Sequence, residues 1–167
     1  MSGSRKMISH GYAVSTVGRI IVLVWNDTPS VEGVVALKDA FVTADARSKV
    51  DALGLLTLIE AKAGGGMPPP VRDHLAQVIK ENERAIKATA VVYEGTGFRA
   101  TIVRSVLTAI NMLNRPDYWF AVFQNRTLAT EQLLAQMGRS EVPTRDELLE
   151  ALASLTRHEQ PAAVAQV

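Results

Sequence analysis

The chain contains no cysteine among its 167 residues, which excludes disulfide bonds, thiolate metal ligands and a cysteine nucleophile. It has almost no charge excess: its formal net charge is +1, whereas a dedicated nucleic-acid-binding protein shows a clear basic excess. No apolar stretch approaches the ~20 residues that a membrane-spanning helix needs, and the polar start lacks the apolar core of a signal peptide. We therefore expect a cytoplasmic protein that neither binds nucleic acid nor inserts into a membrane.

The composition is that of one folded domain with short tails. Apolar residues make up 47% of the chain and charged residues 21%, which is ordinary for a globular domain with a real core. We place that domain at residues 8–157. Residues 1–7 are predicted to form a flexible tail, and the Ala-, Gln- and Pro-rich residues 158–167 a disordered one.

Five apolar segments have the composition of β-strands. The first, residues 8–16, alternates only weakly, and Val17-Gly18 then forms a tight turn into the largely β-branched run 20–25. These two segments are close enough for a hairpin, and an unbroken apolar run is typical of a strand covered on both faces. Further strands are predicted at 55–59, 89–93 and 119–123.

Helical segments alternate with these strands. The spacing of apolar residues predicts helices over 29–47, 71–86, 98–113 and 127–137. Thr28 followed by Pro29 is interpreted as the N-cap and first residue of the first helix. Gly138 is interpreted as the C-cap of the fourth helix.

A last helix is predicted at 144–157. Thr144 and Glu147 form a capping box at its start, and one face carries Leu148, Leu149, Leu152 and Leu155. An apolar face must be covered, either by its own domain or by a second copy of the chain. Homo-oligomerisation therefore stays open.

The order of elements defines a fold class. It reads ββαβαβαβα plus a C-terminal helix, and strands that alternate with helices imply a largely parallel sheet with helices packed on it. The opening hairpin adds an antiparallel edge. We predict a single layered α/β domain on a central, mixed, mostly parallel five-stranded sheet.

The last third of the chain resembles a known family. The segments that carry the resemblance are Ala90–Tyr93, Thr96–Phe98, Ala121–Phe123 and Leu128–Glu131. They resemble the SpoIIAA-like branch of STAS domains, the fold of sulfate-transporter and anti-sigma-factor-antagonist domains, and the resemblance extends over residues 12–137. It implies a non-enzymatic regulatory or scaffolding module that acts by protein–protein binding in a bacterial signalling system.

One departure from that family concerns regulation. In its anti-sigma antagonists, a partner kinase phosphorylates a serine at the start of the helix after the third strand, which turns binding off. The matching segment here, Ala61–Val71, contains no serine or threonine, so we expect partner binding without that switch. Other relatives bind apolar ligands or nucleotides, so a small-ligand binding or sensing domain is the alternative function.

Two loops are the candidate partner-binding sites, because both follow strands and open α/β sheets bind at the carboxyl ends of their strands. One loop contains Gly64, Gly65 and Gly66. It lacks the Lys-Ser/Thr of a phosphate-binding loop, and a plain flexible connector is the simpler interpretation. The other loop contains Glu94, Thr96, Gly97, Phe98 and Arg99.

The second loop holds two residues with expected roles. Thr96 is a good N-cap, and Arg99 falls in the first helical turn, where a positive charge opposes the helix dipole. We therefore expect Arg99 to pair with Glu94 or, alternatively, to contact an acidic partner. We expect the following arginines to be solvated surface residues that do not form a basic patch, because the net charge is near zero: Arg99, Arg104, Arg115 and Arg126.

The sequence displays no catalytic constellation. Its histidines lie far apart and lack metal-ligand spacing, namely His10, His74 and His158. There is no Gly-x-Ser-x-Gly elbow, and Glu60 at a strand end is an isolated acid–base candidate. We therefore expect no enzymatic activity, no cofactor and no metal.

Overall fold

One six-stranded sheet organises the fold, and its strands follow one another across the sheet in sequence order. They are β1 (Met7–Ile8), β2 (Tyr12–Val17), β3 (Ile20–Trp25), β4 (Leu53–Ile59), β5 (Ile86–Tyr93) and β6 (Trp119–Phe123). The pairs β1–β2 and β2–β3 are antiparallel, and β3 to β6 pair in parallel. A mixed sheet in an α/β fold is thus confirmed. The predicted number of strands is wrong, because residues 8–16 are divided between β1 and β2 by a turn in which the Ser9 amide donates to the Tyr12 carbonyl.

The computed structural model describes most of the predicted domain. The described residues are 6–47, 52–63, 66–97, 100–101, 103–105, 108, 116–138 and 142–156. Four of the candidate site residues lie outside them, namely Gly64, Gly65, Phe98 and Arg99, as does the predicted tail 158–167.

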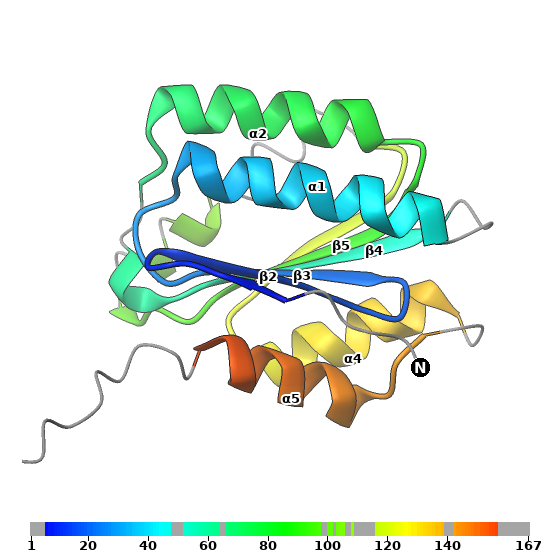
Figure 1. Ribbon diagram of the computed structural model, residues 1–167. Helices are drawn as coiled ribbons and strands as arrows, with labels where there is room; N and C mark the ends of the chain where they lie inside the picture. Colours follow the sequence, from blue (N-terminus) through cyan, green and yellow to red (C-terminus); the bar gives the residue numbers. More distant parts are fainter. Residues whose placement is uncertain are drawn as a thin grey trace, which may run out of the picture.

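Helices cover both faces of the sheet (Figure 1). One face carries α1 (Val31–Arg47) and α2 (Pro69–Asn82), and the other carries α4 (Arg126–Met137) and α5 (Arg145–Thr156). Between β5 and β6, the described residues 97, 100–101, 103–105 and 108 are helical. A short 3-10 turn, η1 (Ala61–Ala63), follows β4.

The alternation of side chains along each strand divides the core into two layers. In β3, the residues that face α4 and α5 are Ile20, Val22 and Val24, and those that face α1 and α2 are Ile21, Leu23 and Trp25. The predicted leucine face of the last helix is buried in the first of these layers through Leu148, Leu152 and Leu155. That face therefore covers the chain's own sheet.

The first helix begins later than predicted. Ser30 caps α1, because its Oγ accepts a hydrogen bond from the Gly33 amide over 3.3 Å and its carbonyl accepts one from Val34 over 3.2 Å. The prediction of Thr28 as N-cap is wrong, and Thr28-Pro29 lies in the turn before the helix. Serine at this position satisfies amides that the first helical turn leaves unpaired.

The second helix is shorter than predicted, because α2 ends at Asn82 and Ile86 belongs to β5. The Ala85 amide donates to the Asn82 carbonyl over 2.9 Å and turns the chain back toward the sheet. Ile86 is then buried in the layer beneath α1 and α2. In the sequence, Ile86 continues the helical spacing of apolar residues. In the structure, it is the first residue of β5 and its side chain is buried there.

The predicted signals at the ends of the last two helices are confirmed. The Glu147 amide donates to Thr144 Oγ1 over 3.2 Å, and the Thr144 amide donates to Glu147 Oε2 over 2.6 Å, which is the reciprocal pattern of a capping box. Gly138 follows α4 with φ of 79°, a conformation that favours glycine. Asn125 caps the start of α4 by accepting from the Leu128 amide over 3.0 Å, so α4 starts one residue before the predicted Thr127.

Gly33 is required by close packing between α1 and β3. A Cβ at Gly33 would lie 2.3 Å from Cζ3 of Trp25 and 3.1 Å from Cγ of Tyr12. We expect Gly33→Ala to lower the free energy of unfolding by about 1–3 kcal/mol, although alanine is favoured over glycine in a helix by about 1 kcal/mol. Urea denaturation measures the change.

Gly66→Ala is the matched control, because nothing lies within 4 Å of the Cβ it would add. It should be neutral or slightly stabilising, since alanine restricts the unfolded chain. Equal destabilisation by the two substitutions would contradict the packing described for Gly33.

The capping box of α5 makes stability depend on pH. Hydrogen bonds from the Thr144 backbone and hydroxyl lower the pKa of Glu147 from its ordinary 4.5. Because the folded pKa is depressed, the ionised carboxylate contributes stability above pH 4.5, and this contribution is lost as the pH falls through the lower folded value. At neutral pH, the urea midpoint of the wild type should therefore be higher than that of Glu147→Gln, and in acid the two midpoints should become equal. A difference in midpoint that did not change with pH would contradict this.

Candidate functional site

Parallel pairing aligns the ends of β3, β4 and β5. Trp25 pairs with Ile59, and Ile59 pairs with Tyr93. The Glu60 amide continues the ladder by donating to the Trp25 carbonyl over 3.1 Å. The residue after each of these strands is polar, and together they form what we call the carboxyl-edge row: Asn26, Glu60 and Glu94.

The carboxyl-edge row faces the layer of α4 and α5. Trp25 and Ile59 pack in the opposite layer, toward α1 and α2. Successive residues of a strand point to opposite faces, so the next residue of each strand is directed toward α4 and α5. The first residue of α4, Arg126, reaches the row from that side.

Arg126 and Glu94 form a bidentate ion pair. Nε of Arg126 donates to Oε2 of Glu94 over 2.7 Å, and Nη2 donates to Oε1 over 2.5 Å. Both side chains are less than a third exposed, at 28% and 29%, so solvent screens the pair only in part. The hydrogen bond to Glu94 raises the pKa of Arg126 above its usual value, against the lowering effect of burial, and the charges of Glu94 and Glu60 raise it further.

The structure gives Glu94 a different partner from the predicted one. The sequence suggested Arg99, five residues along the same loop, but both carboxylate oxygens of Glu94 are bonded to Arg126, 32 residues away. Parallel pairing of β5 with β6 brings Arg126 there, because α4 begins just after β6. Arg99 itself lies outside the described residues.

The loop after β5 is also held by Arg104. Nη1 of Arg104 donates to the carbonyl of Gly95 over 3.2 Å and to that of Tyr93 over 3.4 Å. The Tyr93 ring packs against Gly95 so closely that a Cβ there would lie 2.5 Å from Cε1. Two arginines from separate elements therefore hold this loop, and the predicted site residues Thr96 and Gly97 are exposed on it.

The glycine loop after β4 is described only at its end. Gly66 is exposed, and an added Cβ would meet nothing within 4 Å. The loop follows β4, which neighbours β5 in the sheet, so both predicted loops belong to the same edge.

Asn26 and Glu60 carry buried oxygens without hydrogen bonds. Within the described part of the chain, Asn26 Oδ1 and Glu60 Oε2 have no hydrogen-bond partner. Nζ of Lys62 lies 3.4 Å from Glu60 Oε2, which allows charge attraction without the alignment of a hydrogen bond. Of the carboxyl-edge row, Glu60 and Glu94 were identified from the sequence, whereas Asn26 and the role of Arg126 were missed. The available signal was that a polar residue follows each apolar strand directly.

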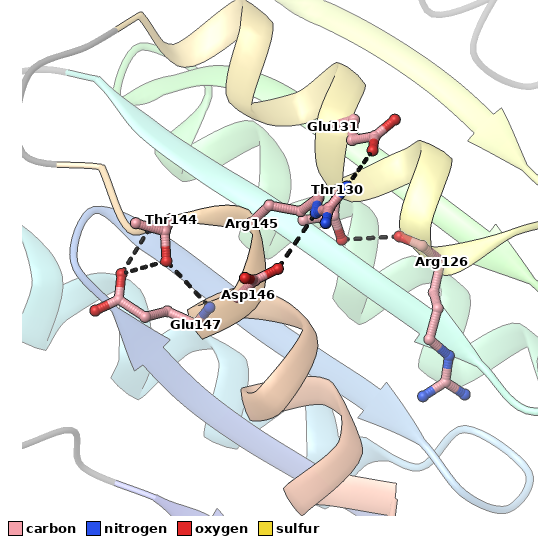
Figure 2. Close-up of polar contacts among 7 residues, drawn as sticks. All are labelled: Arg126, Thr130, Glu131, Thr144, Arg145, Asp146 and Glu147. Atoms are coloured by element: carbon pink, nitrogen blue, oxygen red, sulfur yellow. Dashed lines mark hydrogen bonds and ion pairs between the residues drawn. The ribbon is translucent and has the colours of Figure 1, made fainter.

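A separate polar group joins α4 to α5. Nη1 of Arg145 donates to Glu131 over 2.9 Å and Nε donates to Asp146 over 3.3 Å, beside the Thr144–Glu147 capping box (Figure 2). In Figure 2 the guanidinium of Arg126 extends away from this group. The side chains around Arg145 are exposed, so they connect the two helices at the surface.

Comparison of the chain with family models, with curated proteins and with solved structures found no match. The strand pairing places the chain in the class of α/β domains with a mixed six-stranded sheet. Across the described ranges, no helix is long and apolar enough to cross a membrane. Nor do three or more His, Asp or Glu side chains of these ranges gather in a way that could hold a metal ion.

A double-mutant cycle measures how strongly Glu94 and Arg126 interact. We expect Glu94→Gln and Arg126→Gln to show a coupling energy of about 1–2 kcal/mol in urea denaturation, because the pair is bidentate and partly buried. The control cycle, Glu131→Gln with Arg145→Gln, involves side chains that are about half exposed, and its coupling should be smaller and fall further in high salt. Equal coupling in both cycles would contradict this account of the site.

Proposed function

We propose that this chain is a non-enzymatic, STAS-like regulatory or scaffolding module that binds another protein in a bacterial signalling system. Its binding face is the loop Glu94–Gly97 together with the first turn of α4. The proposal rests on one observation: Arg104 and Arg126, which come from two different helical segments, both hydrogen-bond to this loop, while Thr96 and Gly97 stay exposed on it.

A loop held in this way is suited to binding. Segments that are ordered before binding lose less conformational entropy when a partner docks. Arg104 and Arg126 use their hydrogen bonds on the backbone and on the carboxylate of the loop, so Thr96 and Gly97 remain available at the surface. The charges of Glu94 and Arg126 compensate each other within this face.

The proposed face also includes an exposed apolar residue in the first turn of α4. Leu128 belongs to the first turn of α4, two residues after Arg126, and is 48% exposed. Protein interfaces combine apolar contacts with a polar rim and depend on a few central residues. Leu128 would supply such an apolar contact on the part of the proposed face that α4 forms.

The topology and the loop after β4 are consistent with the resemblance to STAS domains. An antiparallel hairpin precedes β–α units that add strands in sequence order. The segment from Ala61 to Val71, where the family's antagonists carry their phosphorylated serine, provides no hydroxyl group. This supports partner binding that is not switched off by phosphorylation there.

Quantitative capture of partners from the lysate of the native organism tests the binding face. Leu128→Asp and Thr96→Asp should each weaken binding of the specific partner by roughly tenfold or more, because each introduces a charge at a central contact. The matched control is Val42→Asp on α1, in the opposite helical layer, where Val42 is 64% exposed. Circular dichroism establishes that all variants are folded.

Retention of the partner by both Leu128→Asp and Thr96→Asp would rule out this face. A loss of equal size in Val42→Asp would do the same, since α1 is not part of the proposed face. If no specific partner is captured and native mass spectrometry finds a co-purified small molecule, the ligand-binding alternative replaces the proposal.

A further inference from the structure

The last strand of the sheet, β6, has an open edge. It pairs with β5 alone and stands at the end of the strand order, so no strand of the described ranges lies on its other side. Neighbouring peptide groups of a strand point to opposite sides, and the outer side of β6 therefore presents N–H and C=O groups without ladder partners. Such an edge is a template for a further strand.

This edge lacks the features that keep free sheet edges apart. Natural edge strands are very short or carry charged residues or proline. The opposite edge strand, β1, has 2 residues, whereas β6 has 5, Trp119–Phe123, without a charged residue or a proline. All residues of β6 are half-buried, while those of β3 are all buried. Because side chains alternate, β6 leaves apolar surface open on both of its faces.

The sequence of β6 is self-complementary in the antiparallel direction. When two copies are aligned about Ala121, Trp119 of one lies opposite Phe123 of the other, and Phe120 lies opposite Val122. Trp119 and Phe123 share one face, where their ring centroids are 6.1 Å apart within a chain. Alternation places Phe120 and Val122 on the other face. Aromatic pairs and aromatic–β-branched pairs both stabilise neighbouring strands.

The residues that flank β6 favour the same direction. Asp117 precedes the strand and is exposed, and Arg126 follows it as the first residue of α4. In the antiparallel alignment, Asp117 lies opposite Asn125 of the second copy, the residue before Arg126. Parallel alignment would place the two Asp117 carboxylates together, and like charges directly opposite each other are destabilising.

We propose that two copies of this chain pair antiparallel along β6, with Ala121 on the two-fold axis, so that their sheets join into one. The contact is isologous, because both copies use the same strand. Antiparallel pairing directs the carboxyl edges of the two copies to opposite ends of the joined sheet, so the dimer would present two partner-binding faces. That consequence rests on the proposed function, whereas the dimer itself does not.

An introduced thiol tests the alignment, because the chain contains no cysteine of its own. Directly opposed residues of antiparallel strands have Cα atoms about 4.5–5.5 Å apart, a separation that a disulfide spans. Under mild oxidation, Ala121→Cys should therefore become a covalent dimer on a non-reducing gel. The matched control is Val42→Cys on α1, where Val42 is 64% exposed; it should stay monomeric although its thiol is accessible.

Paired charges test the same alignment without a thiol. Light scattering should give twice the monomer mass for the wild type. Phe120→Glu and Val122→Lys should each be monomeric, because each sets a charge against an apolar side chain twice in the dimer. Mixed in equal amounts, they should form a heterodimer, since the introduced glutamate and lysine then lie opposite each other and the second pair stays apolar. Circular dichroism establishes that the variants are folded.

A wild type that stays monomeric up to about 1 mM would overturn the proposal and leave the edge to a strand of a different protein. A dimer that neither charged variant weakens would overturn it too, because that dimer would use another surface. Equal cross-linking of Ala121→Cys and Val42→Cys, or a mixture of charged variants that stays monomeric, would exclude the alignment about Ala121. If the charged variants do not fold, the wild-type mass and the two cysteine variants still decide the question.

Discussion

In-register parallel pairing of β3, β4 and β5 is the constraint on which the candidate site depends. Trp25, Ile59 and Tyr93 are paired across the three strands, and the apolar residues before them fill both layers of the core. Because side chains alternate with a period of two, this register alone decides that the next residues share one edge and one face. The carboxyl-edge row is thus a consequence of how the core is packed.

The helix α4 connects the core to the site. Leu133 and Met137 are buried beneath the sheet, and Met137 Sδ comes so close to Gly54 that an added Cβ there would lie 3.0 Å from it. This packing sets the position of α4, and its first residue, Arg126, is thereby placed against Glu94. The ion pair at the edge and the packing of this layer are therefore coupled, so a change in one is expected to affect the other.

Local sequence signals were sufficient where neighbouring residues decide the structure. The strands 20–25 and 119–123 and the capping box at Thr144 form as predicted, because unbroken apolar runs and reciprocal caps act over a few residues. The end of α2 was misplaced, since Ile86 fits a helical face in the sequence and only the sheet determines its burial.

The candidate site was harder to predict, because its contacts join distant segments. Sequence reasoning found Glu94 and its loop, but it looked for the partner of Glu94 within the same loop and not at Arg126. Asn26 and Glu60 are each recognisable as the polar residue after an apolar strand. That they lie side by side follows from which strands are neighbours and in which register, which local patterns in the sequence do not reveal.

Trans-hydrogen-bond scalar couplings, measured by NMR on isotope-labelled protein, report directly whether β3 and β4 pair in this register. We expect a coupling between the amide nitrogen of Glu60 and the carbonyl carbon of Trp25, because the Glu60 amide donates to the Trp25 carbonyl over 3.1 Å. A coupling from Ile59 or Ala61 to Trp25 instead would mean that the register is shifted by one residue. Such a shift would turn the side chain of Glu60 to the opposite face and remove the carboxyl-edge row.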